Sequence, residues 1–105
     1  MDKKKMNTTV EFEFCDGSKT ELTLAFIKLY ELRAKNKAQY EKYSKIMSKG
    51  TTDELETITI LYTAYLCAHL GEEDLLTETE FMELCGSDRV TAQNAAYSLI
   101  RPKKQ

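Results

Sequence analysis

The amino-acid sequence predicts an α+β fold that is mainly α, in which an N-terminal antiparallel β-hairpin packs on a bundle of about five helices. Apolar and polar residues alternate on both sides of Asp16 and Gly17, which is typical of two strands joined by a tight turn. From residue 25 onward the apolar residues recur at helical spacing instead. The 105 residues are enough for one domain with a single core.

We divide this single domain, 1–105, into four segments. Residues 1–8 are expected to be a mobile basic N-terminus, and residues 101–105 a mobile C-terminus rich in lysine. Between them, residues 9–24 are expected to form the hairpin and residues 25–100 the helical bundle.

The hairpin loop is predicted from the pattern of its two strands. A two-residue Asp-Gly turn would place Phe12 opposite Glu21. A loop with an odd number of residues, centred on Gly17, gives instead the pairs Phe14 with Thr20, Phe12 with Leu22 and Val10 with Leu24. Only the odd loop gathers the apolar residues on one face, because a slip of one residue turns a strand inside out. We therefore predict a loop of three or five residues, with Gly17 in a conformation that other residues resist.

Helical periodicity and capping residues predict where the helices begin and end. The expected ranges are about 25–34, 37–48, 52–70, a short helix that ends at Cys85, and 88–100. The expected caps and stops are Thr23, Ser87, Gly50 and Gly86. The expected capping boxes are Thr51 with Glu54 and Thr77 with Glu80.

The third predicted helix is expected to be the centre of the core. It carries a stretch without charge, Thr57 to Gly71, and is apolar on more than one side. The other elements are expected to turn one apolar face toward it. The residues expected in the core are Phe12, Phe14, Leu22, Phe26, Leu29, Leu32, Tyr43, Met47, Leu55, Ile58, Leu61, Tyr62, Tyr65, Leu66, Phe81 and Tyr97.

The net charge of −2 conceals two oppositely charged segments. Residues 28–49 carry seven Lys and Arg against two Glu, whereas residues 53–88 carry ten Asp and Glu and no Lys or Arg. Such segments can form complementary surface poles, or they can neutralise each other within one molecule. The candidate self-association and partner residues are Lys35, Lys42, Lys45, Glu73, Asp74, Glu80 and Glu83.

The residue types of a catalytic, cofactor or metal site are not found at the necessary spacings. Cys67 and His69 lie two positions apart on a predicted helix, so their side chains point to different faces. The three cysteines are odd in number and widely spaced, which suggests reduced thiols rather than a disulfide framework or a zinc knuckle. The acidic run Glu72 to Asp74 lacks the spacing of an EF-hand. We expect a protein that is not an enzyme and has no cofactor.

A membrane and a nucleic acid are considered as partners. The uncharged stretch is shorter than the about 20 apolar residues that a membrane span needs, and no export signal is visible, so we expect a cytoplasmic protein. The lysine-rich second helix, with Tyr40 and Tyr43, leaves the alternative of a small nucleic-acid-binding regulator. The acidic balance of the chain and the expected burial of both tyrosines make this partner less favoured.

Three stretches resemble a known family. The segments "FEFCDGSKTELTLAFIKLYELRAKNKAQYEKYSKIMSKG", "LYTAYLCAHL" and "RPKKQ" follow one another as in the tail assembly chaperones of long-tailed, siphovirus-like phages and prophages of Gram-positive bacteria. The resemblance covers about residues 9–104 and rests on segment order, because the family has no catalytic motif.

The resemblance implies a non-enzymatic scaffold that acts in the cytoplasm of the bacterial host and is absent from the mature virion. Its implied partners are the tape measure protein, which it keeps soluble, and the tail tube protein, which it recruits. Members of the family are described as self-associating in spirals or rings. A homo-oligomer is therefore expected.

Overall fold

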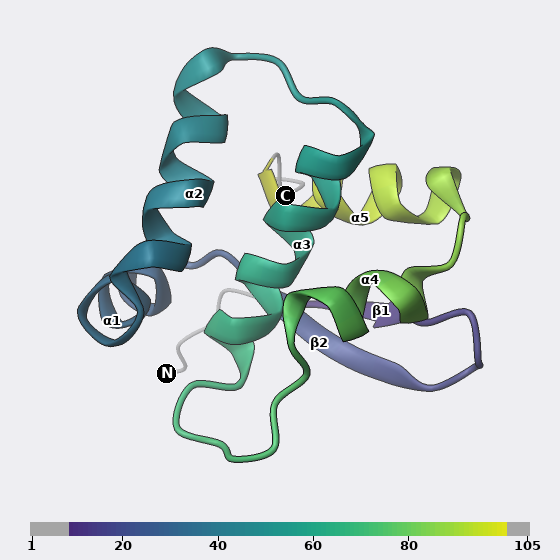
Figure 1. Cartoon of the computed structure of the whole chain (residues 1–105), viewed down its shortest axis with the longest axis horizontal. Coiled ribbons are helices and arrows are strands. Elements are labelled where there is room, and N and C mark those ends of the chain that lie inside the picture. The colour runs from purple at the N-terminus through teal and green to yellow at the C-terminus, as the bar shows by residue number, and fades with distance from the viewer. Residues whose placement is uncertain (1–8, 101–105) are drawn as a thin grey trace, which may run out of the picture.

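The computed structural model describes residues 9–100 and confirms the α+β, mainly α class. The elements are β1 (Thr9–Glu13), β2 (Lys19–Thr23), α1 (Phe26–Lys35), α2 (Lys37–Lys49), α3 (Glu54–Ala68), α4 (Glu78–Cys85) and α5 (Arg89–Ile100). Helix α3 crosses the middle of the molecule, with α1 and α2 on one side and α4, α5 and the hairpin on the other (Figure 1). The mobile ends expected at 1–8 and 101–105 lie outside the described residues.

The hairpin has the odd loop that was predicted, but its register is shifted by two residues. Five residues, 14–18, connect the strands, and Phe12 pairs with Thr20 rather than with Leu22, which pairs with Val10. The loop is centred on Asp16 because its carboxylate accepts hydrogen bonds from the backbone N–H and the hydroxyl of Ser18. A shift of two residues keeps every side chain on its face.

The capping boxes show how neighbouring candidates compete. The box predicted at Thr77 and Glu80 is confirmed, with bonds of 3.2 and 2.9 Å. The box predicted at Thr51 and Glu54 is wrong, since Asp53 and Glu56 form it instead, with bonds of 2.8 and 3.1 Å. An aspartate is at least as good a cap as a threonine, and α3 therefore begins at Glu54.

The caps of the first and last helices also differ from the prediction. Ala25 is the N-cap of α1, and the hydroxyl of Thr23 accepts a hydrogen bond from the N–H of Ala25 without capping the helix. At α5 the carboxylate of Asp88, not the hydroxyl of Ser87, accepts from the N–H of Thr91 at 3.1 Å. Gly50 ends α2 at φ +86°, as expected of a left-handed C-terminal residue.

An aromatic cluster joins the hairpin to α3 and α4. Phe81, which has no exposed surface, lies 5.3 Å from Phe14 and 6.1 Å from Phe12 between ring centroids. On its other sides are Tyr62 at 5.6 Å and Tyr65 at 5.4 Å. The tyrosine hydroxyls stay satisfied because one donates to the carbonyl of residue 76 and the other accepts from the N–H of the same residue.

Most of the residues expected in the core are buried. Those that the structure buries are Phe12, Phe14, Leu22, Leu29, Leu32, Leu61, Tyr62, Tyr65, Leu66 and Phe81. Tyr43, Met47 and Ile58 are half-buried. The prediction is wrong for Phe26, Leu55 and Tyr97, which are 89%, 65% and 65% exposed.

These three errors arise because some helices have apolar residues on more than one side. In α1 the inner face consists of Leu29 and Leu32, so the first residue of the helix, Phe26, turns outward. In α5 the alanines and Leu99 face the core, and Tyr97 lies on the opposite side at 100° per residue. Leu55 stands at the mouth of a pocket described below.

A buried polar pair links α2 to α3. The amide of Gln39 donates to the hydroxyl of Thr63 at 3.1 Å, and that hydroxyl donates to the carbonyl of Thr59 at 2.8 Å. Both side chains are buried, and among the described residues no buried side-chain nitrogen or oxygen lacks a partner. The pair therefore fixes the position of α2 against α3 at little net cost.

Removing the hydroxyl of Thr63 is expected to destabilise the fold. Thr63→Val leaves the buried amide of Gln39 without its acceptor, which lowers the free energy of unfolding by about 1–3 kcal/mol. Adding Gln39→Leu should recover most of the loss, because both partners are then apolar. Urea unfolding of the single and double variants measures this coupling, and losses that simply add in the double variant would contradict it.

Candidate interaction surface

The two charged segments partly neutralise each other within the molecule. Lys42 of α2 forms an ion pair of 2.6 Å with Glu78 at the start of α4, and the hydroxyl of Thr59 donates to the same carboxylate at 2.9 Å. Lys49 likewise pairs with Glu56 of α3. The alternative of internal neutralisation thus holds for two lysines of α2, and these charges have partners of their own.

The other candidate partner residues are spread over separate parts of the surface. Lys35 ends α1 and Lys45 lies on α2, both exposed. Glu73 and Asp74 are exposed in the loop between α3 and α4, where Asp74 has a positive φ of 60°. The remaining two lie on α4: Glu80 belongs to the capping box and Glu83 is exposed.

The structure exposes an apolar surface on α1 that sequence reasoning assigned in part to the core. Phe26, Ile27 and Tyr30 are 89%, 60% and 64% exposed, and we call these three residues the α1 apolar face. The guanidinium of Arg33 lies 5.7 Å from the ring centroids of Tyr30 and Tyr40 and extends the face with a cation. The signal was present in the sequence, because 26–32 holds more apolar residues than one helix face can bury.

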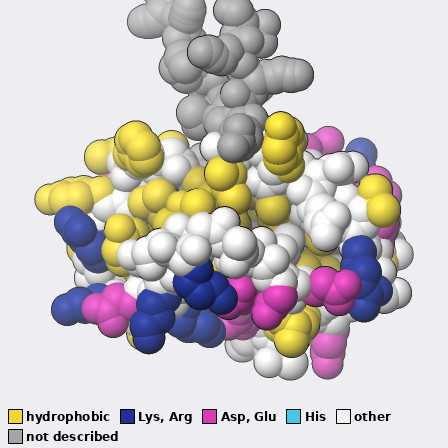
Figure 2. Space-filling model, turned by 90° about the horizontal axis from the view of Figure 1, so that it is seen from above, with side chains coloured by type: hydrophobic (Ala, Val, Ile, Leu, Met, Phe, Trp, Pro, Cys, Tyr) yellow, Lys and Arg dark blue, Asp and Glu magenta, His cyan; other side chains and the backbone are white. Residues whose placement is uncertain are grey.

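A second exposed apolar surface runs along α5. Val90, Tyr97 and Ile100 are 68%, 65% and 40% exposed, and we call them the α5 apolar stripe. They lie opposite the alanines that pack on α3. Seen from the side on which α2 ends and α3 begins, apolar side chains gather in a broad area bordered by charged ones (Figure 2).

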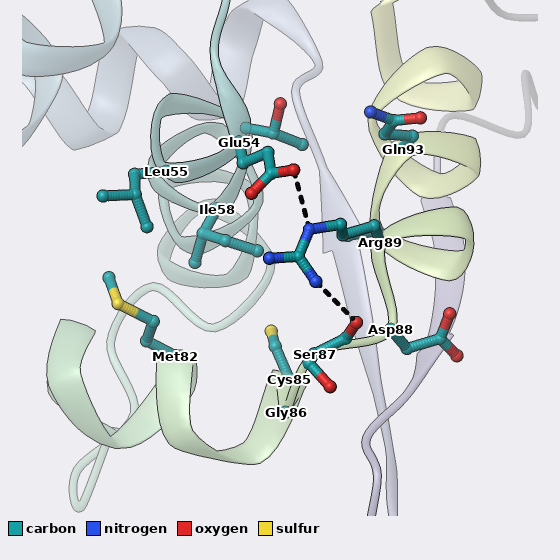
Figure 3. A pocket seen from close by; sticks show the side chains of 12 residues that line it. Glu54, Leu55, Ile58, Met82, Cys85, Gly86, Ser87, Asp88, Arg89 and Gln93 are labelled. Atoms are coloured by element: carbon teal, nitrogen blue, oxygen red, sulfur yellow. Dashed lines mark hydrogen bonds and ion pairs between the residues drawn. The ribbon is translucent and has the colours of Figure 1, made fainter.

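A small pocket lies between the first turns of α3, helix α4 and the start of α5. Its apolar wall includes Leu55, Ile58 and Met82, and its volume is about 110 Å³ (Figure 3). Arg89 crosses the rim, where its Nε donates to a carboxylate oxygen of Glu54 at 2.7 Å. Pockets for cofactors are roughly 300–1,000 Å³. This pocket, which we call the α3–α5 pocket, therefore has room for one apolar side chain of a partner.

Charged side chains lie around the α3–α5 pocket. The hydrogen bond from Arg89 holds the pKa of Glu54 below its usual value. The hydroxyl and the N–H of Thr91 likewise hold the pKa of Asp88 below its usual value. Both carboxylates are thus ionised, but Glu54 is paired with Arg89, and the carboxylate of Asp88 points away from the pocket (Figure 3). The pocket presents an apolar interior with one ion pair at its rim.

The residues considered for a catalytic or metal site do not act together in the structure. Cys67 is buried in α3, and burial raises the pKa of its thiol to about 12. The ring of His69 bonds to Glu72 and to Thr20 of β2, both at 2.9 Å. Within residues 9–100, no group of three or more His, Cys, Asp or Glu side chains is placed to hold a metal ion.

The structure of residues 9–100 also bears on the membrane and the nucleic acid that the sequence analysis considered as partners. None of its helices combines the length and the apolar character that crossing a bilayer requires. The tyrosines of α2 are half-buried, and three of its lysines are paired with carboxylates, which leaves less free charge for phosphate groups.

Comparisons with known proteins leave the function to be argued from the molecule itself. No protein-family model matches the chain, and no curated protein or solved structure matches it either.

Proposed function

We propose that this protein is a non-enzymatic tail assembly chaperone of a phage or prophage, which binds the tape measure protein and recruits tail tube subunits in the host cytoplasm. The observation that carries the proposal is the exposure of large apolar side chains on α1 and α5. The family resemblance of residues 9–104 supplies the identity of the partners.

The α1 apolar face has the composition of a protein interface. Monomeric proteins rarely expose adjacent large apolar residues without a function. Aromatic residues and arginine are enriched where partners bind, and Phe26, Tyr30 and Arg33 provide both. Exposed lysines add little affinity each, so the apolar contact supplies most of the binding energy.

The partner of the α1 apolar face, in this proposal, is the α3–α5 pocket of a second copy. Phe26 is the most exposed large apolar residue within 9–100, and the pocket has room for one side chain. The cation of Arg33 beside the face complements the carboxylate of Glu54 at the pocket rim. Because the two surfaces differ, such contacts continue head to tail into an open spiral unless the rotation closes.

The α5 apolar stripe is then left for the client. A tape measure protein is long and helix-rich, and an amphipathic helix binds by laying its apolar side on a matching surface. Val90, Tyr97 and Ile100 extend over the full length of α5 and offer such a surface. Coating the client in this way would keep its apolar residues from aggregating.

Co-expression with the tape measure protein of the same phage or prophage tests the function. We expect the client to move from the insoluble to the soluble fraction when the chaperone is present, and to co-purify with it. A matched culture that expresses the Val90→Ser variant should keep less client in solution. A client whose solubility is the same with and without this protein would contradict the proposal, as would a monomer that binds DNA with a steep salt dependence.

A further inference from the structure

Two cysteines far apart in the sequence lie together where the hairpin loop meets the end of α4. Cys15 is exposed in the loop, and Cys85 is the buried last residue of the helix. The N–H of Cys15 donates to the carbonyl of Leu84, the residue before Cys85, at 2.8 Å. Cys15 has no role in the proposed function, and Cys85 enters it only as part of the lining of the α3–α5 pocket.

The side chain of Cys15 lies against the end of α4. A Cβ atom placed on Gly86 would lie 3.3 Å from both Cβ and Sγ of Cys15, so the Cys15 side chain rests against the residue that follows Cys85. Cys15 and Cys85 line the same hollow of about 290 Å³, together with Phe14 and Asp88. The hollow leaves the sulfur atoms room to approach each other.

The backbone contact brings Cys15 next to Cys85. Its hydrogen bond joins Cys15 to Leu84, whose Cα atom lies about 3.8 Å from that of Cys85 along the chain. Disulfides span Cα separations of about 4.4–6.8 Å. Cys85 lines both this hollow and the α3–α5 pocket, toward which its sulfur points in Figure 3, so the disulfide requires a rotation about the Cys85 side chain.

We propose that Cys15 and Cys85 form a reversible disulfide by exchange with a low-molecular-weight disulfide such as oxidised glutathione. The bond ties the hairpin loop to the C-terminal end of α4. This inference goes beyond the proposed function and stands whether or not the protein is a chaperone.

The exposed thiol reacts first. The thiolate of Cys15 attacks one sulfur of oxidised glutathione, which forms a mixed disulfide and releases one glutathione thiolate. Burial is the main cause that raises the pKa of Cys85 to about 11 in the reduced protein, so Cys85 reacts second. After losing its proton to solvent it attacks Sγ of Cys15 and releases the second glutathione thiolate. Two protein thiols are oxidised, and one glutathione disulfide takes up the two electrons.

Peptide mapping of the full chain under non-reducing conditions tests the proposal. After incubation with oxidised glutathione, we expect one cross-linked peptide that joins Cys15 to Cys85. The bond closes a loop of about 70 residues, which should raise Tm by about 10 °C relative to the reduced protein. Oxidation in urea should give mixed pairings instead, because the fold then no longer selects the partner.

Three single variants separate the roles of the cysteines. Cys85→Ala should retain glutathione on Cys15, Cys15→Ala should show neither the adduct nor the cross-link, and Cys67→Ala should behave as the wild type. A wild-type chain that keeps glutathione on Cys15 without closing the internal bond would overturn the inference. So would a cross-link through Cys67 or between two chains. Because the wild-type map is decisive by itself, a variant that fails to fold does not affect the test.

Discussion

Phe26→Ser is expected to weaken self-association at least about tenfold while leaving the fold intact. Burying a phenylalanine side chain is worth about 1.5–3 kcal/mol, and a tenfold change in affinity corresponds to about 1.4 kcal/mol. Since Phe26 is 89% exposed in the single chain, its loss costs the monomer little. Light scattering over a range of protein concentrations measures the assembly, and circular dichroism checks the fold.

Val90→Ser is the matched control for this variant. Val90 is 68% exposed, but it belongs to the α5 apolar stripe, which is assigned to the client. The control should assemble as the wild type does. If both variants assemble normally, or if the wild type stays monomeric at every concentration, the α1 apolar face is not a self-association surface.

A mixing experiment tests whether the contact is head to tail. Leu55→Lys places a cation at the mouth of the α3–α5 pocket, where it should repel Arg33 of an incoming copy. At a protein concentration at which Phe26→Ser stays monomeric, neither variant should assemble alone. Mixed together, they should form a 1:1 dimer and nothing larger, because each keeps the surface that the other has lost. If no dimer forms, the α1 apolar face and the α3–α5 pocket do not bind each other.

Phe81→Ala is expected to have the largest effect on stability. The ring has no exposed surface and lies between the hairpin and α3, within about 5–6 Å of four other aromatic rings. Truncating a buried phenylalanine costs about 3–5 kcal/mol, out of a total stability of about 5–15 kcal/mol for a domain. Thermal and urea unfolding should show a greatly destabilised or unfolded chain.

Phe26→Ala is the control of the same residue type. It removes the same atoms from an exposed position, so the free energy of unfolding should change by less than about 0.5 kcal/mol. Similar losses in the two alanine variants would mean that Phe81 is not the centre of the core.

The sequence predicts that the first and last helices exist, but it was harder to predict which face of each helix is buried. Helical spacing and caps mark α1 and α5, but each has apolar residues on more than one side. In α5 the chosen face is the one with three alanines, because small side chains let the helix approach α3 closely. The larger Tyr97 was expected in the core but lies at the surface, as does Val90. The candidate site was missed for this reason, although the surplus of apolar residues was visible.

The sequence by itself determined the features that depend on a few neighbouring residues. These include the odd hairpin loop, the Thr77 capping box and the ends of α2 and α4 at glycine. Tertiary structure decided what depends on packing: which helix faces are buried, whether Lys42 meets a carboxylate of its own chain, and which thiols become neighbours. The physical reason is that hydrogen bonds of turns and caps span three or four residues. The burial of a face depends instead on the shape of what it packs against, which no local pattern contains.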